Sequence, residues 1–349
     1  MCIDLNRFLG IAVIGMMMPL IGGCYLLQAA QGQAAVMAQR QPVAAVIKDP
    51  RTTPELRARL NDVVAAREFA SRELGLPDNE SYRQYADIGR NFVVWNVFAT
   101  PPFSVEPRRW CFPVAGCVAY RGYFAEHRAQ DYADRLRRRG NDVAVGGVTA
   151  YSTLGHFADP VLSSMLRWND AQLAGTLFHE LAHQLVYVQD DSAFNEAFAS
   201  TVEEVGVVRW LTATGRLREL DAWQLQRQRV EEFSQLVLAT REELRTLYAQ
   251  PLTPLEMNHR KHQLLGLLKY RYEQQKEQWG GYSGYDNWFA RTLTNADLVS
   301  TATYRRCIPG FKRMLDSVQG DLPVFYADVR RLAQEEAAAR QRKLCGPGA

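Results

Sequence analysis

The chain has 349 residues, which is enough for one large domain or two with a sizeable hydrophobic core. Its hydrophobic content of 47% and charged content of 23% are those of an ordinary globular protein. The net charge of +3 is small and the basic residues are scattered, which argues against a nucleic-acid-binding protein.

The sequence predicts that residues 1–23 are a signal peptide and not part of the folded domain. The apolar stretch at residues 8–21 is too short to span a bilayer, and Pro19 interrupts it. Ile21-Gly22-Gly23-Cys24 resembles a bacterial lipobox, in which cleavage before the cysteine leaves it as a lipidated N-terminus. We therefore expect Cys24 to anchor an exported lipoprotein to a membrane. The alternative is a short membrane anchor that is not cleaved.

Tyr25 and the remaining cysteines indicate the cellular compartment in which the mature protein is located. An aspartate after the lipidated cysteine commonly marks retention in the inner membrane, so Tyr25 favours the outer membrane, facing the periplasm. Cysteines exported there meet an oxidising environment. Cys111 and Cys117 bracket a turn-rich loop that could join them in a disulfide; a second metal site is the alternative, but no histidine lies near. Cys307 and Cys345 could form another pair.

The ends of the mature chain are predicted to lie outside the main domain. Residues 24–50 are rich in Ala and Gln and indicate a lipid-anchored spacer or a first helix. Residues 51–341 form the main domain. Residues 342–349 are expected to be a frayed tail unless Cys345 holds them in place.

The main domain shows alternating helix and strand patterns. The first helix is clear, because apolar residues recur every three or four positions between Thr53-Pro54 and Gly75. The expected order is helix 53–74, strand 91–99, helix 125–139, strand 142–148, two helices that carry the motifs described below, helices 216–248 and 255–279, and short helices 309–318 and 322–341. This order predicts an α+β fold that is mainly α, with a small β-sheet and a long helical hairpin.

An H-E-x-x-H motif lies in the apolar run Phe178-His179-Glu180-Leu181-Ala182-His183-Gln184. Histidines four residues apart on a helix differ by about 40° in azimuth, so both imidazoles can reach one metal ion. Glu180 lies beside the first histidine, where it can act as the general base of a zinc hydrolase. Asn169 and Gln172 predict a capping box at the start of this helix. A buried helix with two satisfied histidines is the alternative.

A zinc site needs a third protein ligand. Glu196 lies within Asn195-Glu196-Ala197 at the start of the next helix, and Glu-ligated zinc peptidases take their third ligand from a similar place. We therefore expect His179, His183 and Glu196 to hold Zn²⁺. Glu203, two turns further along the same face, is the alternative ligand or a partner for one of the histidines.

The strand before the motif helix has a possible role in substrate binding. In zinc peptidases of this type, an edge strand pairs with the extended backbone of the substrate. We place this edge at residues 143–152, with Gly146 and Gly147 allowing close approach. A structural strand with a glycine bulge is the alternative.

The chain resembles a family of predicted zinc-dependent aminopeptidases, which are lipoproteins of Gram-negative bacteria. The resemblance covers residues 25–340, nearly the whole mature chain. It rests on Trp110-Cys111-Phe112-Pro113-Val114-Ala115-Gly116-Cys117, Tyr120-Arg121-Gly122-Tyr123-Phe124, Gly146-Gly147-Val148, Tyr151-Ser152-Thr153-Leu154-Gly155, the segment from His179 to Gln184, and Phe194-Asn195-Glu196. It implies a zincin-like fold of the Glu-ligated type that acts on peptide substrates.

The resemblance also implies the reaction, which is removal of N-terminal residues from peptides by zinc-activated water with Glu180 as general base. An aminopeptidase needs a carboxylate near the metal to bind the substrate ammonium group, and Glu203 and Glu204 are the nearest acidic residues in sequence. The tyrosines that could stabilise the oxyanion are Tyr151, Tyr285 and Tyr304. The alternatives are a zinc endopeptidase and a non-catalytic lipoprotein that uses the zincin fold as a binding or assembly module.

Overall fold

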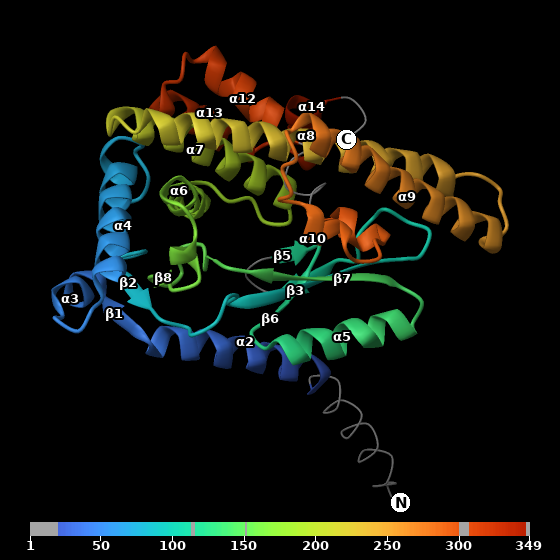
Figure 1. The fold of residues 1–349 in the computed structure, drawn as a ribbon, viewed down its shortest axis with the longest axis horizontal. Helices are drawn as coiled ribbons and strands as arrows, with labels where there is room; N and C mark the ends of the chain where they lie inside the picture. Colours follow the sequence, from blue (N-terminus) through green and yellow to red (C-terminus); the bar gives the residue numbers. More distant parts are fainter. Residues whose placement is uncertain (1–19, 113–115, 151, 300–306, 347–349) are drawn as a thin grey trace, which may run out of the picture.

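The structure is a computed structural model that describes residues 20–112, 116–150, 152–299 and 307–346. This part of the chain is mainly helical with short strands, which confirms the predicted α+β class (Figure 1). The helices are α2 (Leu20–Ala38), α3 (Val43–Lys48), α4 (Pro54–Arg72), α5 (Glu126–Arg138), α6 (Asp170–Leu185), α7 (Ser192–Ala213), α8 (Leu217–Tyr248), α9 (Pro254–Gln278), α10 (Asp286–Phe289), α12 (Ile308–Ser317), α13 (Leu322–Ala333) and α14 (Ala337–Cys345). The strands are β1 (Arg40–Pro42), β2 (Gln84–Ala86), β3 (Val94–Thr100), β4 (Trp110–Phe112), β5 (Gly116–Val118), β6 (Arg121–Tyr123), β7 (Asp142–Val148) and β8 (Val161–Leu162).

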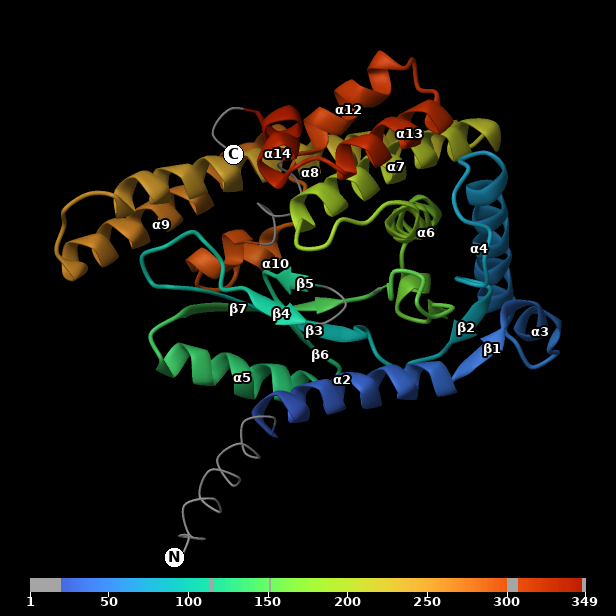
Figure 2. The ribbon, with the colours of Figure 1, turned by 180° about the vertical axis from the view of Figure 1, so that it is seen from behind.

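An antiparallel sheet of order β6-β3-β7 lies between two layers of helices. Figures 1 and 2 show α2 and α5 on one side of this sheet and the longer helices α6 to α9 on the other. A second small sheet has the order β1-β2-β8, and β4 pairs with β5. Cys111 and Cys117 are opposite each other in the β4–β5 pair and form a disulfide, the pairing expected for this loop.

Among the described strands, β7 lies at the edge of its sheet and precedes the motif helix, as predicted. A Cβ added at Gly146 would meet no atom within 4 Å, so the face of the strand is open at this position. A Cβ at Gly147 would lie 2.4 Å from Cγ of Phe92, so this glycine makes room for a ring of the protein itself. The strand ends at Val148, and Tyr151 lies outside the described residues.

The motif helix α6 begins at the predicted capping box. The Asn169 side chain accepts a hydrogen bond from the Gln172 N–H (2.9 Å), and the Gln172 side chain accepts one from the Asn169 N–H (3.4 Å). The helix ends at Leu185. The reason is Asn195, whose amide accepts from the Val188 N–H (2.8 Å) and donates to its carbonyl (2.7 Å), so the chain turns there instead of continuing the helix.

Helices α6 and α7 pack against each other in the largest core of the protein. α4 lies against α6, and α12 and α13 cover α7 (Figure 2). The Phe198 ring of α7 lies 5.9 Å from the Phe311 ring and 6.0 Å from the Phe325 ring. Each buried side chain of this size contributes about 1.5–3 kcal/mol of hydrophobic stabilisation, which holds α7 against α12 and α13.

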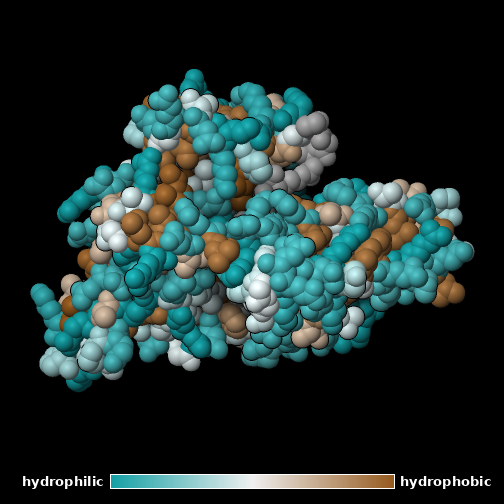
Figure 3. Space-filling view, turned by 45° about the horizontal axis from the view of Figure 1, so that its top comes forward, coloured by the Kyte–Doolittle hydropathy of each residue, from teal (hydrophilic) through white to brown (hydrophobic). Residues whose placement is uncertain are grey.

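Helices α8 and α9 form the predicted hairpin, which has its own core with α10. Figure 3 shows apolar residues in brown between polar residues in teal along this hairpin, at the right of the view. Tyr285 belongs to this core, where its ring stacks on Phe233 with centroids 3.9 Å apart. The hairpin is attached to the sheet by Lys261, which is 4% exposed and contacts the Asp142 carboxylate at the start of β7 (2.5 Å).

The segment at residues 24–50 is part of the packed fold and is not a separate spacer. The Tyr25 ring of α2 stacks on Phe112 with centroids 5.3 Å apart, and Val36 is buried in the largest core. Strand β1 pairs with β2, so Arg40 is opposite Ala86. Composition left open a spacer or a first helix; the structure has the helix α2, and the apolar residues of this segment have partners from distant parts of the chain. None of the described helices combines the length and apolar character needed to span a membrane.

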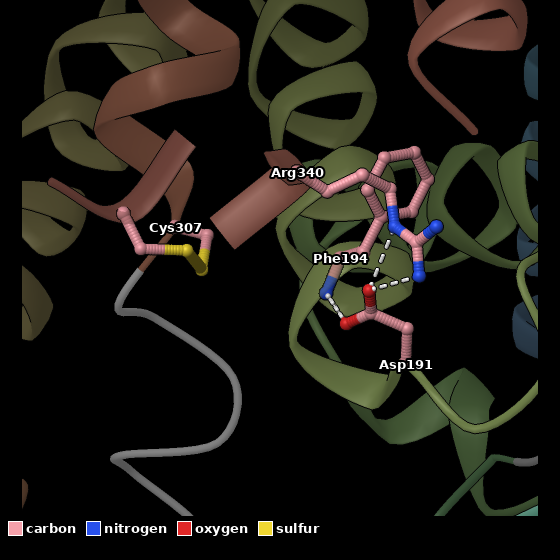
Figure 4. Close-up of a disulfide and its surroundings, with 5 residues drawn as sticks. Asp191, Phe194, Cys307 and Arg340 are labelled. Atoms are coloured by element: carbon pink, nitrogen blue, oxygen red, sulfur yellow. Dashed lines mark hydrogen bonds and ion pairs between the residues drawn. A yellow bond between two sulfur atoms is a disulfide. The ribbon is translucent and has the colours of Figure 1, made fainter. Parts of the chain in front are cut away.

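The C-terminal region also differs from the prediction. Residues 322–341, expected as one helix, form α13 and α14 with a break between them. α14 then continues to Cys345, which forms a disulfide with Cys307 at the start of α12, so the described part of the expected tail is held in place (Figure 4). The break allows α14 to reach α7, where Arg340 makes an ion pair with Asp191 (2.8 Å) and both side chains are 8% exposed.

The Lys261–Asp142 contact predicts a large effect on stability. Lys261→Met would leave the Asp142 carboxylate buried without its ammonium partner, so we expect the free energy of unfolding to fall by about 3 kcal/mol. Lys269→Met changes an exposed lysine of the same helix and should change it by less than about 0.5 kcal/mol. Urea denaturation followed by circular dichroism compares the two; equal stabilities would contradict this account of the hairpin.

Candidate metal centre

Two imidazole nitrogens and one carboxylate oxygen meet where α6 contacts α7. His179 Nε2 lies 3.1 Å from His183 Nε2 and 3.3 Å from Glu196 Oε2, and His183 Nε2 lies 3.8 Å from the same oxygen. Ligand atoms bound to one zinc ion at about 2.0–2.2 Å in a tetrahedron are about 3.3–3.6 Å apart. The three atoms therefore have the spacing of three corners of a zinc site, and the donor set is one that zinc binds.

The two helices supply these atoms for simple geometric reasons. Histidines in an i, i+4 relation leave one face of α6, and Glu196 lies near the start of α7 on the face toward α6. Gly175 lets the helices approach, because a Cβ there would lie 3.1 Å from Val207 Cγ2 and 3.2 Å from Glu203 Cγ. The room that Gly175 leaves is therefore filled by side chains of α7.

Glu203 lies behind His179 as its hydrogen-bonding partner. Its Oε2 is 3.2 Å from His179 Nδ1, the ring nitrogen that faces away from the cluster. Such a carboxylate fixes the orientation of a metal-binding imidazole. Of the two roles that the sequence left open for Glu203, the structure therefore favours partner over ligand.

The carboxylates of Glu203 and Glu204 already have cationic partners. Arg227 of α8 lies 3.6 Å from Glu203 and also contacts Glu204, and Lys312 of α12 contacts Glu204 as well. The expectation that either residue binds a substrate ammonium group is not supported, because their charge is compensated within the protein. Their proximity to Glu196 in the sequence suggested a place near the metal. The cations that neutralise them come from α8 and α12, which the sequence could not show.

Glu180 has a different environment from these paired carboxylates. It is half-buried and makes no hydrogen bond or ion pair with a described residue. Burial raises the pKa of its carboxyl to about 7. A carboxylate beside the first histidine that no described residue binds is available to a water molecule or a substrate.

The two histidines have opposite electrostatic environments. Burial lowers the pKa of His183 to about 4, so its imidazole is neutral and can donate a lone pair to a metal. Burial also acts to lower the pKa of His179, but hydrogen bonds to Glu196 and Glu203 outweigh it and hold that pKa well above its usual range. The cluster thus favours a positive charge at its centre, which a metal ion would supply.

The start of α7 is fixed by α14 (Figure 4). The Asp191 carboxylate caps α7 by accepting from the Phe194 N–H (3.2 Å) and also contacts Arg340. The Arg340 guanidinium lies 5.7 Å from the centre of the Phe194 ring. Because Glu196 follows within the first turns of α7, the C-terminal helix helps to hold the third candidate ligand in position.

The described tyrosines near the cluster include two that the sequence did not suggest. Tyr285 lies in the hairpin core, and Tyr151 and Tyr304 lie outside the described residues. Tyr187 has its ring 6.4 Å from that of His183. Burial and the charge of Glu196 raise the pKa of both Tyr120 and Tyr187, so both hydroxyls remain protonated and could donate a hydrogen bond. Tyr120 was missed as a site residue, although it begins one of the segments that carry the family resemblance.

The close approach at Gly175 predicts a change in metal affinity. In Gly175→Ala the new methyl group would push against Glu203 and Val207, so we expect zinc affinity to fall by about tenfold. Gly266→Ala is the matched control, because a Cβ there meets nothing within 4 Å. Competition with a chromogenic chelator measures both affinities, and an unchanged affinity for Gly175→Ala would refute the role given to this glycine.

The comparisons with known proteins identify a family. A family model described as "Putative aminopeptidase" matches residues 24–344, which is most of the chain and includes both motif helices. No curated protein and no solved structure matches the chain. The chain therefore belongs to the aminopeptidase family that this model describes.

Proposed function

We propose that this protein is a zinc-dependent aminopeptidase in which His179, His183 and Glu196 hold the metal and Glu180 is the general base. One observation carries the proposal: three candidate ligand atoms lie 3.1–3.8 Å apart beside a carboxylate that no other described residue engages. Family membership supports the peptidase activity independently of this geometry. The arrangement is that of a Glu-ligated zincin.

Zinc, when bound, would lower the pKa of a coordinated water to about 7 and polarise the peptide carbonyl. Glu180 accepts the proton of the attacking water and transfers it to the leaving amine. Glu203 holds the His179 ring in the orientation that directs Nε2 to the metal. The hydroxyls of Tyr120 and Tyr187 are the candidate hydrogen-bond donors to the oxygen that becomes negative.

Strand β7 is the element that we propose binds the substrate backbone. It is an edge strand among the described residues, and Gly146 and Gly147 on it are exposed. Main-chain hydrogen bonds to an edge strand bind an extended peptide without selecting its side chains. Substrates are therefore expected to be extended peptides.

A zinc endopeptidase is the second candidate. The observation in its favour is that Glu203 and Glu204 are paired with Arg227 and Lys312, so neither offers a free charge for a substrate ammonium group. The same zinc chemistry serves both kinds of peptidase. The preference for an aminopeptidase comes from the family.

We also propose that the protein is a lipoprotein of the outer membrane, anchored through Cys24 and facing the periplasm. The lipobox at residues 21–24 supports this location, and the family match begins at Cys24 itself. The disulfides Cys111–Cys117 and Cys307–Cys345 fit an oxidising compartment.

The assigned roles predict that metal binding and catalysis can be separated. Glu180→Gln should retain zinc but lower kcat by about 10²–10⁴-fold, because it removes the base and leaves the ligands intact. Glu196→Gln should lose zinc, and Glu203→Gln should bind it about 10–100-fold more weakly. Metal analysis of the purified variants measures the zinc content, and peptide hydrolysis measures kcat. Stoichiometric zinc in Glu196→Gln would assign the third ligand to another residue.

The choice between exopeptidase and endopeptidase predicts a dependence on the substrate amino group. An aminopeptidase should cleave a peptide with a free N-terminus and leave its N-acetylated counterpart intact, because acetylation removes the ammonium charge. Mass spectrometry of the products compares the two peptides. Equal hydrolysis of both would exclude an aminopeptidase and favour the endopeptidase.

The lipoprotein assignment predicts a specific processing product. The protein recovered from bacterial membranes should begin at Cys24 and carry the mass of attached fatty acids. In Cys24→Ser the signal peptide should not be cleaved and no lipid should be attached, so the protein should remain as the full-length precursor. Intact-mass analysis measures both changes. A Cys24→Ser protein that is processed and fractionates with membranes like the parent protein would contradict the lipoprotein assignment.

A further inference from the structure

A cavity of about 810 Å³ lies between α2, β6 and α5, on the side of the sheet away from α6 and α7 (Figures 1 and 2). It is thus separate from the candidate metal centre. The residues that line it are Tyr25, Leu27, Gln28, Gln31, Arg121, Tyr123, Arg128, Asp131, Tyr132, Arg135, Leu136 and Arg139. Gln28, 5% exposed, ties α2 to β6 by donating to the Gly122 carbonyl (3.3 Å) and accepting from the Phe124 N–H (3.4 Å).

The charge of this cavity is strongly positive. It contains four arginines and one carboxylate, Asp131, and none of the four makes an ion pair with a described residue. By contrast, Arg137 of the same helix α5 does not line the cavity and pairs with Asp134 (2.8 Å). The arginines at 128, 135 and 139 therefore line the cavity without an ion-pair partner among the described residues.

The Arg121 guanidinium is held in place by two aromatic rings of the cavity. Its guanidinium carbon lies 4.0 Å from the centre of the Tyr25 ring and 4.7 Å from that of Tyr132. Its Nε is buried and has no hydrogen-bond partner among the described residues. A guanidinium stacked between rings keeps a fixed plane, and a fixed plane favours bidentate binding of a phosphate.

The surroundings of the cavity indicate what kind of molecule carries the phosphate. Leu26 and Leu27, next to Tyr25, are 49% and 58% exposed. Arginines, tyrosines and exposed leucines together are the composition of a surface that lies in the interface of a membrane. This surface directly follows Cys24, the residue that we expect to carry the lipid anchor.

We propose that this cavity binds the headgroup of an anionic glycerophospholipid, with Arg121, Arg128, Arg135 and Arg139 around its phosphate. The leucines and tyrosines of α2 would lie at the level of the headgroups. Binding would orient the protein on the membrane, with α2 and α5 toward the lipid and the α6–α7 face toward the periplasm. This inference concerns attachment and is independent of whether the metal centre hydrolyses peptides.

The test uses the full-length protein in a non-ionic detergent and native mass spectrometry. The probes are dihexanoylphosphatidylglycerol, dihexanoylphosphatidylcholine, inorganic phosphate and a tetraglutamate peptide. We expect phosphatidylglycerol to bind most tightly, because it combines a net negative charge with acyl chains. Phosphate or the acidic peptide binding as tightly as phosphatidylglycerol would overturn the proposal, since the cavity would then recognise charge without lipid.

A pair of triple variants separates the cavity from net charge. Arg128→Gln, Arg135→Gln and Arg139→Gln change exposed side chains and together should weaken phosphatidylglycerol binding by about a hundredfold. Arg137→Gln, Arg138→Gln and Arg313→Gln remove the same charge elsewhere and should leave it within about threefold of the parent protein. Equal losses in the two triple variants would overturn the proposal.

Discussion

The contact between α6 and α7 is the interaction on which the rest of the structure depends. Gly175 allows the helices to approach, and the approach brings Glu196 to one nitrogen of His179 and Glu203 to the other. Neither helix alone could form this cluster, because the histidines and the carboxylates come from different helices. The hydrophobic core around Phe198 supplies the stabilisation that holds partly buried carboxylates beside partly buried imidazoles.

Distant parts of the chain fix α7 in this position. Arg340 of α14 pairs with the Asp191 cap at one end of the helix, and Arg227 of α8 pairs with the carboxylates further along it. The helices that surround α6 and α7 therefore act as a support for the candidate metal centre. The opposite side of the central sheet carries the arginine-lined cavity and α2, so the two proposed activities, hydrolysis and membrane binding, lie on different faces.

The sequence predicted the features that depend on local physical chemistry. The capping box at Asn169 and the helical spacing of His179 and His183 follow from local hydrogen bonds and periodicity, whereas the edge position of β7 was expected by analogy with zinc peptidases. Features that depend on tertiary contacts were not predictable in this way. Asp191 and Arg340, for example, are 149 residues apart in the chain. Composition likewise could not show that residues 24–50 pack into the fold.

The most direct test of the central claim is zinc K-edge X-ray absorption on the purified full-length protein. The account predicts stoichiometric zinc surrounded only by nitrogen and oxygen, with two imidazoles in the first coordination sphere and bond lengths of about 2.0–2.2 Å. A sulfur contribution at about 2.3 Å, or a protein that binds no zinc, would contradict the assignment of His179, His183 and Glu196 as its ligands.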